Sequence, residues 1–275
     1  GAGLSNLASL ALSRGWLVTG SDVKDGPRLD RLREAGALVA IGHAERNVLG
    51  SGLVQQQGRP SGSGTAECTL PDAIVISSAV SADNVEVRSA LKYNIPLYKR
   101  GAWLGRVTKG HDAVAMAGTH GKTTTSAMMA LVLERCYGSV TAIVGGEVGQ
   151  FSRPREPRQD RDKEEEGETV FDDERDNSGW AEGEAGASGV PAAAVGTGSL
   201  IGSSNWFVLE ADEYDRAFLD LQPKFAMVTN VELDHLDIYE TEEDLLAAFD
   251  EFVDRVAPEG CLVVCGDDPG CVSLA

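Results

Sequence analysis

Residues 112–133 read DAVAMAGTHGKTTTSAMMALVL, and this stretch decides the fold of the central part of the chain. A short apolar run enters a loop bracketed by Gly118 and Gly121, and a lysine and three threonines then open a helical pattern. A strand, a glycine loop and a helix in this order are typical of a phosphate-binding loop. The general pattern G-x-x-x-x-G-K-[ST] also requires a glycine five residues before Gly121, where this chain has Met116. The stretch therefore predicts a phosphate loop that departs from the general pattern.

The residue types in this loop point to phosphate chemistry. Consecutive N–H groups of Gly118–Lys122 can form an anion-binding nest at a helix N-terminus, where the helix dipole also favours negative charge. Lys122 would reach the β- and γ-phosphates of a nucleotide, and Thr123 would offer its hydroxyl to Mg²⁺. The alternative is an ordinary glycine turn before a helix. We favour phosphate binding, because β-branched threonines are poor helix formers and would not otherwise be chosen for a first helical turn.

Two polar clusters follow later apolar runs. The first, NWFVLEADEYD, contains Glu210, Asp212, Glu213 and Asp215, and the second, FAMVTNVELDHLDIY, contains Asn230, Asp234, His235 and Asp237. Open α/β sheets bind ligands beyond the carboxyl ends of their strands, and oxygen ligands suit Mg²⁺. A single loop carboxylate is ordinarily just a solvated charge. At the two strand exits, however, Glu210 and His235 are predicted to contribute to a magnesium site that bridges a triphosphate and a second substrate.

The amino-terminal GAGLS predicts a second nucleotide-binding turn. Gly1 and Gly3 allow a tight turn before a helix, and Asp22 follows about twenty residues later, where an acidic residue can hold a ribose. Asn6 occupies the place of the third glycine of G-x-G-x-x-G, so the pattern is incomplete. We predict a Rossmann-like nucleotide pocket without assigning NAD to it.

Short apolar runs alternate with helical patterns along the chain, which predicts βαβ units and parallel sheets. The predicted fold class is α/β: a Rossmann-like domain over residues 1–108, without its first strand, and an incomplete P-loop α/β domain over residues 109–275. Residues 152–204 are rich in charge, Pro, Gly, Ala and Ser, and we predict a disordered acidic insertion there.

Composition excludes several classes of protein. The formal net charge of −19 disfavours binding to nucleic acid or to an anionic membrane, and no apolar run approaches the ~20 residues of a membrane span. The cysteines show no zinc-site or C-x-x-C spacing, which favours reduced thiols in a reducing compartment; they are Cys68, Cys136, Cys261, Cys265 and Cys271. The abrupt beginning and end of the pattern predict a fragment of a longer protein.

AGTHGKTTT, EADEYD and TNVELDHLD together resemble the Mur ligase family, the ATP-dependent enzymes of peptidoglycan precursor synthesis. The shorter G-T-H-G-K-T-T loop is that family's own variant, so Met116 is not a defect. GAGLS is similar to the family's uridine-nucleotide loop, and the resemblance extends over the chain apart from residues 50–67 and 152–204.

The resemblance implies a role for each matching residue. ATP phosphates are expected at Gly118, Thr119, His120, Gly121, Lys122, Thr123 and Thr124, with Asn230 orienting nearby groups. Lys122, Glu210 and His235 are the expected catalytic residues, and Thr123, Glu210 and His235 are the expected Mg²⁺ ligands. The expected UDP-sugar pocket contains Gly1, Gly3, Ser21, Asp22, Ser78 and Ala79. His43 is as well explained by a structural role as by contact with the sugar nucleotide.

The implied reaction joins L-alanine to UDP-N-acetylmuramate through an acyl phosphate, using ATP and Mg²⁺. One alternative is the recycling branch of the family, which ligates a murein tripeptide to the same UDP-sugar. Another is a truncated, non-catalytic nucleotide-binding relative, since the family's third domain has no counterpart here and we expect this fragment alone to be inactive. A cytoplasmic location is expected, or the plastid stroma if the source is a plastid-bearing eukaryote.

Overall fold

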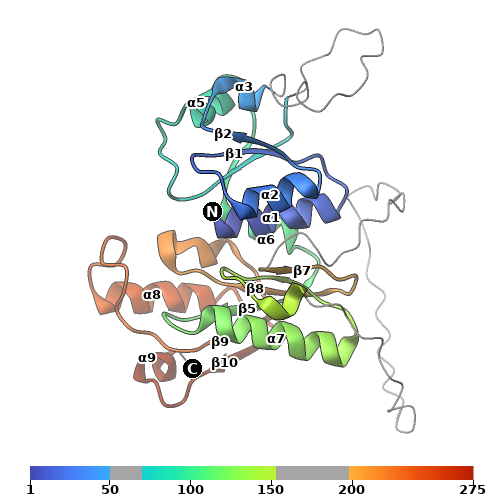
Figure 1. Cartoon of the computed structure of the whole chain (residues 1–275). Helices are drawn as coiled ribbons and strands as arrows, with labels where there is room; N and C mark the ends of the chain where they lie inside the picture. The colour runs from blue at the N-terminus through green and yellow to red at the C-terminus, as the bar shows by residue number, and fades with distance from the viewer. Residues whose placement is uncertain (50–69, 153–197, 275) are drawn as a thin grey trace, which may run out of the picture.

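A computed structural model describes residues 1–49, 70–152 and 198–274. In these ranges the chain forms an amino-terminal part and a central part, both of α/β type, as predicted (Figure 1). Most of the expected insertion, residues 153–197, lies outside the described residues, as does the whole polar loop at 50–67.

The amino-terminal part contains two parallel strand pairs with helices around them. Its elements are α1 (Ala2–Ser13), β1 (Thr19–Asp22), α2 (Pro27–Glu34), β2 (Leu38–Ile41), α3 (Glu45–Val48), β3 (Ile74–Ile76), α5 (Val85–Lys92), β4 (Leu97–Lys99) and α6 (Arg100–Val107). β1 pairs with β2 and β3 pairs with β4, both in parallel. The predicted alternation is therefore confirmed, but the two pairs do not join into one sheet within the described residues.

The central part is a six-stranded sheet in the order β10-β9-β5-β8-β6-β7. Its strands are β5 (Asp112–Ala117), β6 (Thr141–Ile143), β7 (Ser199–Leu200), β8 (Trp206–Glu210), β9 (Phe225–Val228) and β10 (Cys261–Val264). Its helical elements are α7 (Lys122–Tyr137), the 3₁₀ segments η2 (Gly149–Ser152) and η3 (Tyr214–Asp220), α8 (Glu242–Val253) and α9 (Pro269–Ser273). Only the pairing of β6 with β7 is antiparallel in this sheet as described.

β7 corrects the carboxyl-terminal border of the predicted insertion. Ser199 and Leu200 lie inside the range 152–204, yet they form a strand on β6, and Leu200 is buried. Leu200 belongs to the same buried cluster as Val114, Val140 and Phe151, so its apolar side chain explains why a strand forms inside the predicted range.

β5 holds the central position because its sequence suits a strand covered on both faces. Residues 113–117 are all buried, and a continuous run of small and apolar side chains is the pattern expected for an interior parallel strand. α7 packs against this strand, and α8 begins at a capping box made by Thr241 and Asp244. Since β8 and β9 flank β5, the loops that follow all three strands leave from the same edge of the sheet.

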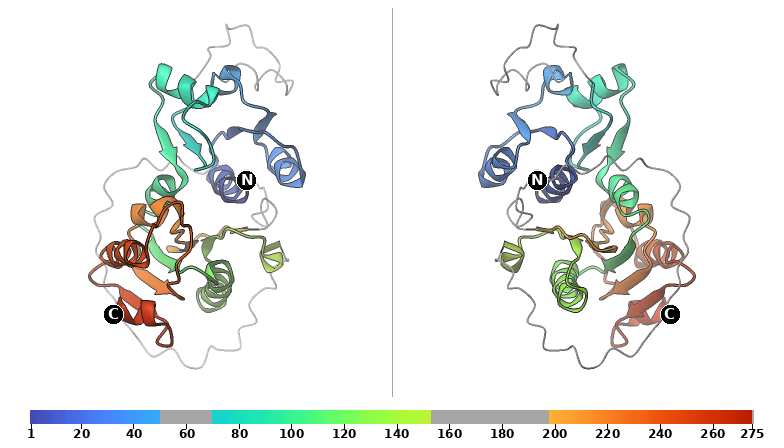
Figure 2. Two further views of the ribbon diagram at one scale, coloured as in Figure 1. Left: turned by 90° about the vertical axis from the view of Figure 1, so that its left-hand side faces the viewer. Right: turned by 90° about the vertical axis from the view of Figure 1, so that its right-hand side faces the viewer.

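The two parts share one hydrophobic core. Leu7 and Leu10 of α1 and Leu104 of α6 belong to the same buried cluster as Phe207 and Leu209 of β8. Figure 2 shows α1 between the amino-terminal strands and the central sheet, in agreement with its contacts to β6 and β7. The elements next to the two predicted nucleotide loops therefore share a continuous hydrophobic core.

No helix among the described residues is both long enough and apolar enough to cross a membrane.

Candidate functional site

The loop between β5 and α7 depends on two glycines. Gly118 has φ 123° and Gly121 has φ 86°, values that side chains with a Cβ rarely adopt. A Cβ at Gly118 would also lie 2.2 Å from Oγ1 of Thr229, so the loop and the start of the β9 loop are in close contact. Gly121 then serves as the N-cap residue of α7.

Hydrogen bonds to the backbone and side chain of Asn230 fasten the predicted phosphate loop to the segment that follows β9. The N–H of Thr119 donates to the carbonyl of Asn230 at 3.0 Å, and the N–H of His120 donates to Oδ1 of Asn230 at 2.8 Å. The amide of Asn230 donates in return to the carbonyl of His120 at 3.0 Å. Asn230 therefore holds the loop in place through both its backbone and its side chain.

These bonds change which N–H groups of the predicted nest are free. Thr119 and His120 already donate to Asn230, so they do not offer their N–H groups to an anion in this conformation. α7 begins at Lys122 without a side-chain cap, so in the described part of the chain the N–H groups of its first turn, including those of Thr123 and Thr124, have no intrahelical acceptor. If an anion binds here as predicted, the donors available to it are the N–H groups of the first turn of α7, where the helix dipole is also favourable.

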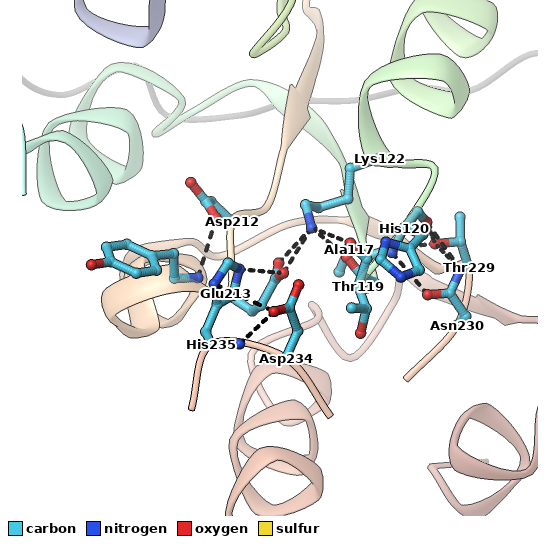
Figure 3. A network of polar contacts seen from close by, with 12 residues as sticks. Ala117, Thr119, His120, Lys122, Asp212, Glu213, Thr229, Asn230, Asp234 and His235 are labelled. Atoms are coloured by element: carbon cyan, nitrogen blue, oxygen red, sulfur yellow. Dashed lines mark hydrogen bonds and ion pairs between the residues drawn. The ribbon is translucent and has the colours of Figure 1, made fainter. Parts of the chain in front are cut away.

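Lys122 points back across the loop toward the segment that follows β8 (Figure 3). Its Nζ donates to the carbonyl of Gly118 at 2.6 Å, to the carbonyl of Thr119 at 3.0 Å and to Oε1 of Glu213 at 2.8 Å. The second carboxylate oxygen of Glu213 lies 2.7 Å from Nζ.

Glu213 is a buried carboxylate at the centre of the site. Its side chain is only 1% exposed, and Oε1 lies 3.4 Å from Nε2 of His235, so it faces both Lys122 and His235. The hydroxyl of Tyr239, itself buried, donates to the carbonyl of Glu213 at 2.7 Å. The sequence placed Glu213 in an acidic cluster but gave it no separate role, because its burial depends on the fold around η3 and α8.

The loops after β8 and β9 contain strained backbone. Asp215, Arg216 and His235 have φ values of 55°, 54° and 54°, in the left-handed region that is unfavourable for residues with a Cβ. Strain of this kind persists where surrounding contacts enforce it and concentrates at functional sites. Here the contacts include the hydrogen bond from Tyr214 to Asp237 and the edge-on packing of the Tyr214 and His235 rings.

Thr123 and Glu210 lie against adjacent glycines of the segment after β6. A Cβ at Gly146 would lie 2.9 Å from Cγ2 of Thr123, and a Cβ at Gly145 would lie 2.5 Å from Oε2 of Glu210. Oε1 of Glu210 is buried and has no hydrogen-bond partner in the described part of the chain. An unpartnered carboxylate oxygen near a threonine at the helix start suits a hard cation, which prefers oxygen ligands.

His235 lies on the Glu213 side of the site. Of the three expected metal ligands, the structure brings Thr123 and Glu210 to one glycine segment, whereas His235 pairs with Glu213. In the chain as described, no three carboxylate, imidazole or thiol side chains form a ready-made metal cluster.

The expected UDP-sugar residues fall into two groups. Near the chain start, the Gly1 nitrogen lies 3.0 Å from Oδ2 of Asp22, and Gly3 lies against the Arg100 side chain. Ser78 and Ala79 are exposed in the segment that follows β3.

Ser21 and His43 share a carboxylate partner. The hydroxyl of Ser21 donates to Oε2 of Glu86 at 2.6 Å, and Nδ1 of His43 lies 3.1 Å from the same oxygen. Asn47 also donates to Glu86, at 2.6 Å. The sequence did not single out Glu86. Its contact with His43 favours the structural role for that histidine over contact with the sugar nucleotide.

Two ion pairs link the amino-terminal part to the loop after β8. Arg100, the first residue of α6, bonds to Asp212, and the adjacent Lys99 lies 2.5 Å from Oδ2 of Asp215. Asp212 and Asp215 bracket the segment that contains Glu213. The same loop therefore contacts both the helix beside Gly3 and the phosphate-loop lysine.

The model of the Mur ligase family catalytic domain matches residues 1–112, and the model of the Mur ligase middle domain matches residues 202–274. This chain belongs to the Mur ligase family. UDP-N-acetylmuramate–L-alanine ligases from Frankia alni and a Nocardioides species are 36% and 38% identical to it over the whole chain. The chain spans 37% and 47% of the lengths of those two relatives.

Solved structures agree with this assignment. The UDP-N-acetylmuramate:L-alanyl-gamma-D-glutamyl-meso-diaminopimelate ligase of Neisseria meningitides has a TM-score of 0.70 and 25% identity; the match covers 100% of this chain and 71% of that one. The UDP-N-acetylmuramate-alanine ligase of Thermotoga maritima has a TM-score of 0.68 and 22% identity; the match covers 100% of this chain and 49% of that one. The second likeness supports the fold alone.

Proposed function

We propose that this chain contributes to an ATP-dependent ligase that joins L-alanine to UDP-N-acetylmuramate in peptidoglycan precursor synthesis. The observation that carries the proposal is the arrangement of Lys122 and the uncapped first turn of α7 at the carboxyl edge of the central sheet. The names of the curated relatives supply the two substrates. A reaction that uses ATP and a UDP-sugar fits the cytoplasm.

The proposed chemistry depends on positioning and on charge neutralisation. The substrate carboxylate would take the γ-phosphoryl group of ATP, with release of ADP, and the amine of L-alanine would then displace phosphate to form an amide. The N–H groups at the start of α7 and the ammonium of Lys122 would hold the phosphates and neutralise charge on the transferring group. Thr123 and Glu210 would hold Mg²⁺, which lowers the negative charge of the triphosphate, and His235 would complete the polar wall of the site.

The amino-terminal part would bind the UDP-sugar beside this centre. Gly3 of α1 lies against Arg100 of α6, and Arg100 bonds to Asp212 in the loop after β8. A sugar nucleotide held at the start of α1 would therefore lie next to the loop that also contacts Lys122. This proximity is what transfer between two bound substrates requires.

A second candidate function is ligation of a tripeptide to the same UDP-sugar. The specific observation in its favour is the structural likeness, at 25% identity, to the Neisseria enzyme named for such a peptide. A third candidate is a nucleotide-binding relative without ligase activity.

Nucleotide binding tests the proposal most directly. The 275-residue chain should bind ATP in the presence of Mg²⁺ in calorimetric titrations, and Lys122→Ala should abolish this binding while binding of UDP-N-acetylmuramate persists. Lys109→Ala, which removes an exposed lysine before β5, is the matched control and should bind ATP normally. ATP binding that survives Lys122→Ala would remove the phosphate-loop assignment.

Product formation separates the candidate functions. Phosphate release from ATP and UDP-N-acetylmuramate that is stimulated by L-alanine, and not by the tripeptide, supports the first candidate. Stimulation by the tripeptide alone supports the second. These assays use a protein that joins this chain to the family's third domain, because we expect the chain alone to release no phosphate under any of the three candidates. Tight nucleotide binding without phosphate release in that protein supports the non-catalytic candidate.

A further inference from the structure

The ammonium of Lys122 has no free donor in the described structure. A lysine ammonium carries three N–H donors, and Nζ of Lys122 has three protein acceptors: two loop carbonyls and the carboxylate of Glu213. The side chain is 15% exposed. An incoming phosphate can therefore bind this ammonium only if one of the three protein contacts is given up.

Glu213 is the contact most suited to exchange. The two carbonyls belong to Gly118 and Thr119, which lie in the same loop as Lys122. They would therefore stay close to the ammonium if the loop shifted. Glu213 belongs to a different loop and is an anion, as is a phosphate, so the two compete for the same charge on Lys122.

If a phosphate replaced Glu213 as the partner of Lys122, the buried Glu213 carboxylate would lose its strongest contact. Glu213 is 1% exposed, and beyond Lys122 the nearest basic group that faces it is the imidazole of His235, at 3.4 Å. A buried charge that loses its partner is strongly destabilised, and the negative charges of the triphosphate would increase the repulsion. A divalent cation that arrives with the triphosphate offsets these effects, since it lowers the net negative charge brought into the site.

We infer that Glu213 is a positioning residue that restrains Lys122 and makes binding of a triphosphate depend on a divalent cation. The inference rests on the proposed binding of ATP. It assigns to Glu213 a role distinct from those of Glu210 and His235: the carboxylate selects the cation-bound form of the nucleotide by keeping the lysine occupied until compensating charge is present.

Glu213→Gln tests this role with little change in shape. The amide can still accept a hydrogen bond from Lys122, but it no longer competes as an anion. We expect this variant to bind ATP in the presence of EDTA about 10- to 100-fold more tightly than the unaltered chain, the range typical of a charged hydrogen bond. With saturating Mg²⁺ the difference should shrink to within about threefold.

Glu232→Gln is the matched control. It removes one negative charge beside the same loop, but the Glu232 side chain is 62% exposed and does not contact Lys122. Its ATP affinity should stay within about threefold of that of the unaltered chain, with or without Mg²⁺, because exposed charges are screened. A gain without Mg²⁺ that is equal in both variants would overturn the inference, since it would reflect net charge alone.

A second readout does not depend on nucleotide binding. In the chain without ligand, an amine-reactive ester should label Lys122 several-fold faster in Glu213→Gln than in the unaltered protein, as mapped by mass spectrometry, while Lys109 is labelled equally in both. If Lys122 is labelled at the same rate in Glu213→Gln and in the unaltered protein, and both are folded, Glu213 does not restrain Lys122. Faster labelling in a chain that binds no ATP would instead support the restraint and refute the proposed function.

Discussion

Gly118 has a backbone conformation and a close contact with Thr229 that exclude a residue with a Cβ. Its φ of 123° and the 2.2 Å approach that a Cβ would make to Oγ1 of Thr229 both oppose a larger side chain. Gly118→Ala should therefore lower the free energy of unfolding by roughly 1–3 kcal/mol and abolish ATP binding, because the loop must shift away from Thr229. Urea denaturation and calorimetric titration measure the two effects.

Gly149→Ala is the control for Gly118→Ala. Gly149 has no left-handed φ, and a Cβ there would meet no atom within 4 Å. Stability should change by less than about 0.5 kcal/mol, as for other unstrained surface substitutions. Equal losses in the two variants would show that the loop does not impose the strain described at Gly118.

Tyr239 predicts a loss of stability at high pH. Burial raises the pKa of Tyr239 to about 12, against an ordinary value of 10.0. The neutral phenol is favoured in the folded state, so its contribution is complete below pH 10 and is lost as the pH rises from about 10 to 12. A difference of this size between the folded and unfolded pKa values corresponds to roughly 2–3 kcal/mol of unfolding free energy.

Tyr239→Phe should remove most of this alkaline loss. At neutral pH the variant should be less stable by about 1 kcal/mol, because the hydrogen bond to the Glu213 carbonyl disappears. Between pH 10 and 12 its unfolding free energy should then fall less steeply than that of the unaltered chain. Tyr137→Phe, which alters an exposed ring, should keep the original slope; if Tyr239→Phe also keeps it, the phenol is not the responsible group.

At the residue scale, the sequence singles out candidate residues that are close together along the chain. Lys122 and Thr123 could be predicted because the glycine loop and the helix start are contiguous in the chain. Glu213 could not be separated from its acidic neighbours, because its 1% exposure and its contacts with Lys122, His235 and Tyr239 depend on segments distant in the sequence. The use of the Thr119 and His120 N–H groups by Asn230 also depends on a partner more than a hundred residues away.

At the scale of elements, α6 and the loop after β8 form a charged contact. Arg100 and Asp212 are 27% and 31% exposed, whereas Arg28 and Glu147 in another contact between the two parts are 44% and 52% exposed. A double-mutant cycle with Arg100→Gln and Asp212→Asn should give a coupling energy of about 1–2 kcal/mol, because lower exposure leaves less solvent screening.

The cycle with Arg28→Gln and Glu147→Gln is the comparison. That pair should couple by less than about 0.5 kcal/mol, and the coupling should vanish in concentrated salt. Urea unfolding of the single and double variants of each pair provides both coupling energies. Coupling at Arg100 no larger than at Arg28 would mean that the loop after β8 is not held by α6.

Elements with strong local patterns were predicted well, and weak ones were not. The strand, loop and helix predicted from residue 112 onward appear as β5 and α7. The apolar residues Trp16 to Val18 do not begin a strand: β1 starts only at Thr19, and Leu17 is 75% exposed. β7 has two residues and exists because β6 offers it an edge, information that no local pattern contains.

At the scale of the whole molecule, Asn6 ties the two parts together. It is 5% exposed, and its Nδ2 donates to the carbonyl of Val144 at 2.7 Å. This contact explains why the third glycine of the amino-terminal pattern is replaced: the position carries a side chain that crosses to the central sheet. A Cβ at Gly198 would lie 2.4 Å from the same nitrogen, so the space around the amide is filled.

Asn6→Ala should lower the unfolding free energy by about 1–3 kcal/mol, because it leaves the Val144 carbonyl unpaired in a buried place. Ser13→Ala, at the exposed end of the same helix, should change stability by less than about 0.5 kcal/mol. Denaturant curves followed by circular dichroism measure both. A loss at Asn6 no greater than at Ser13 would mean that the contact contributes nothing to holding the parts together.

The two borders of the central sheet differ in a way that affects how the protein behaves at high concentration. β7 closes one border with two residues, whereas β10 at the other pairs only with β9 among the strands described and carries exposed Cys261 and Val263. An uncovered parallel strand with apolar and thiol side chains is a template for self-association. Dynamic light scattering should show aggregates that grow with concentration and shrink with reductant, and Val263→Lys should suppress the part that reductant does not remove.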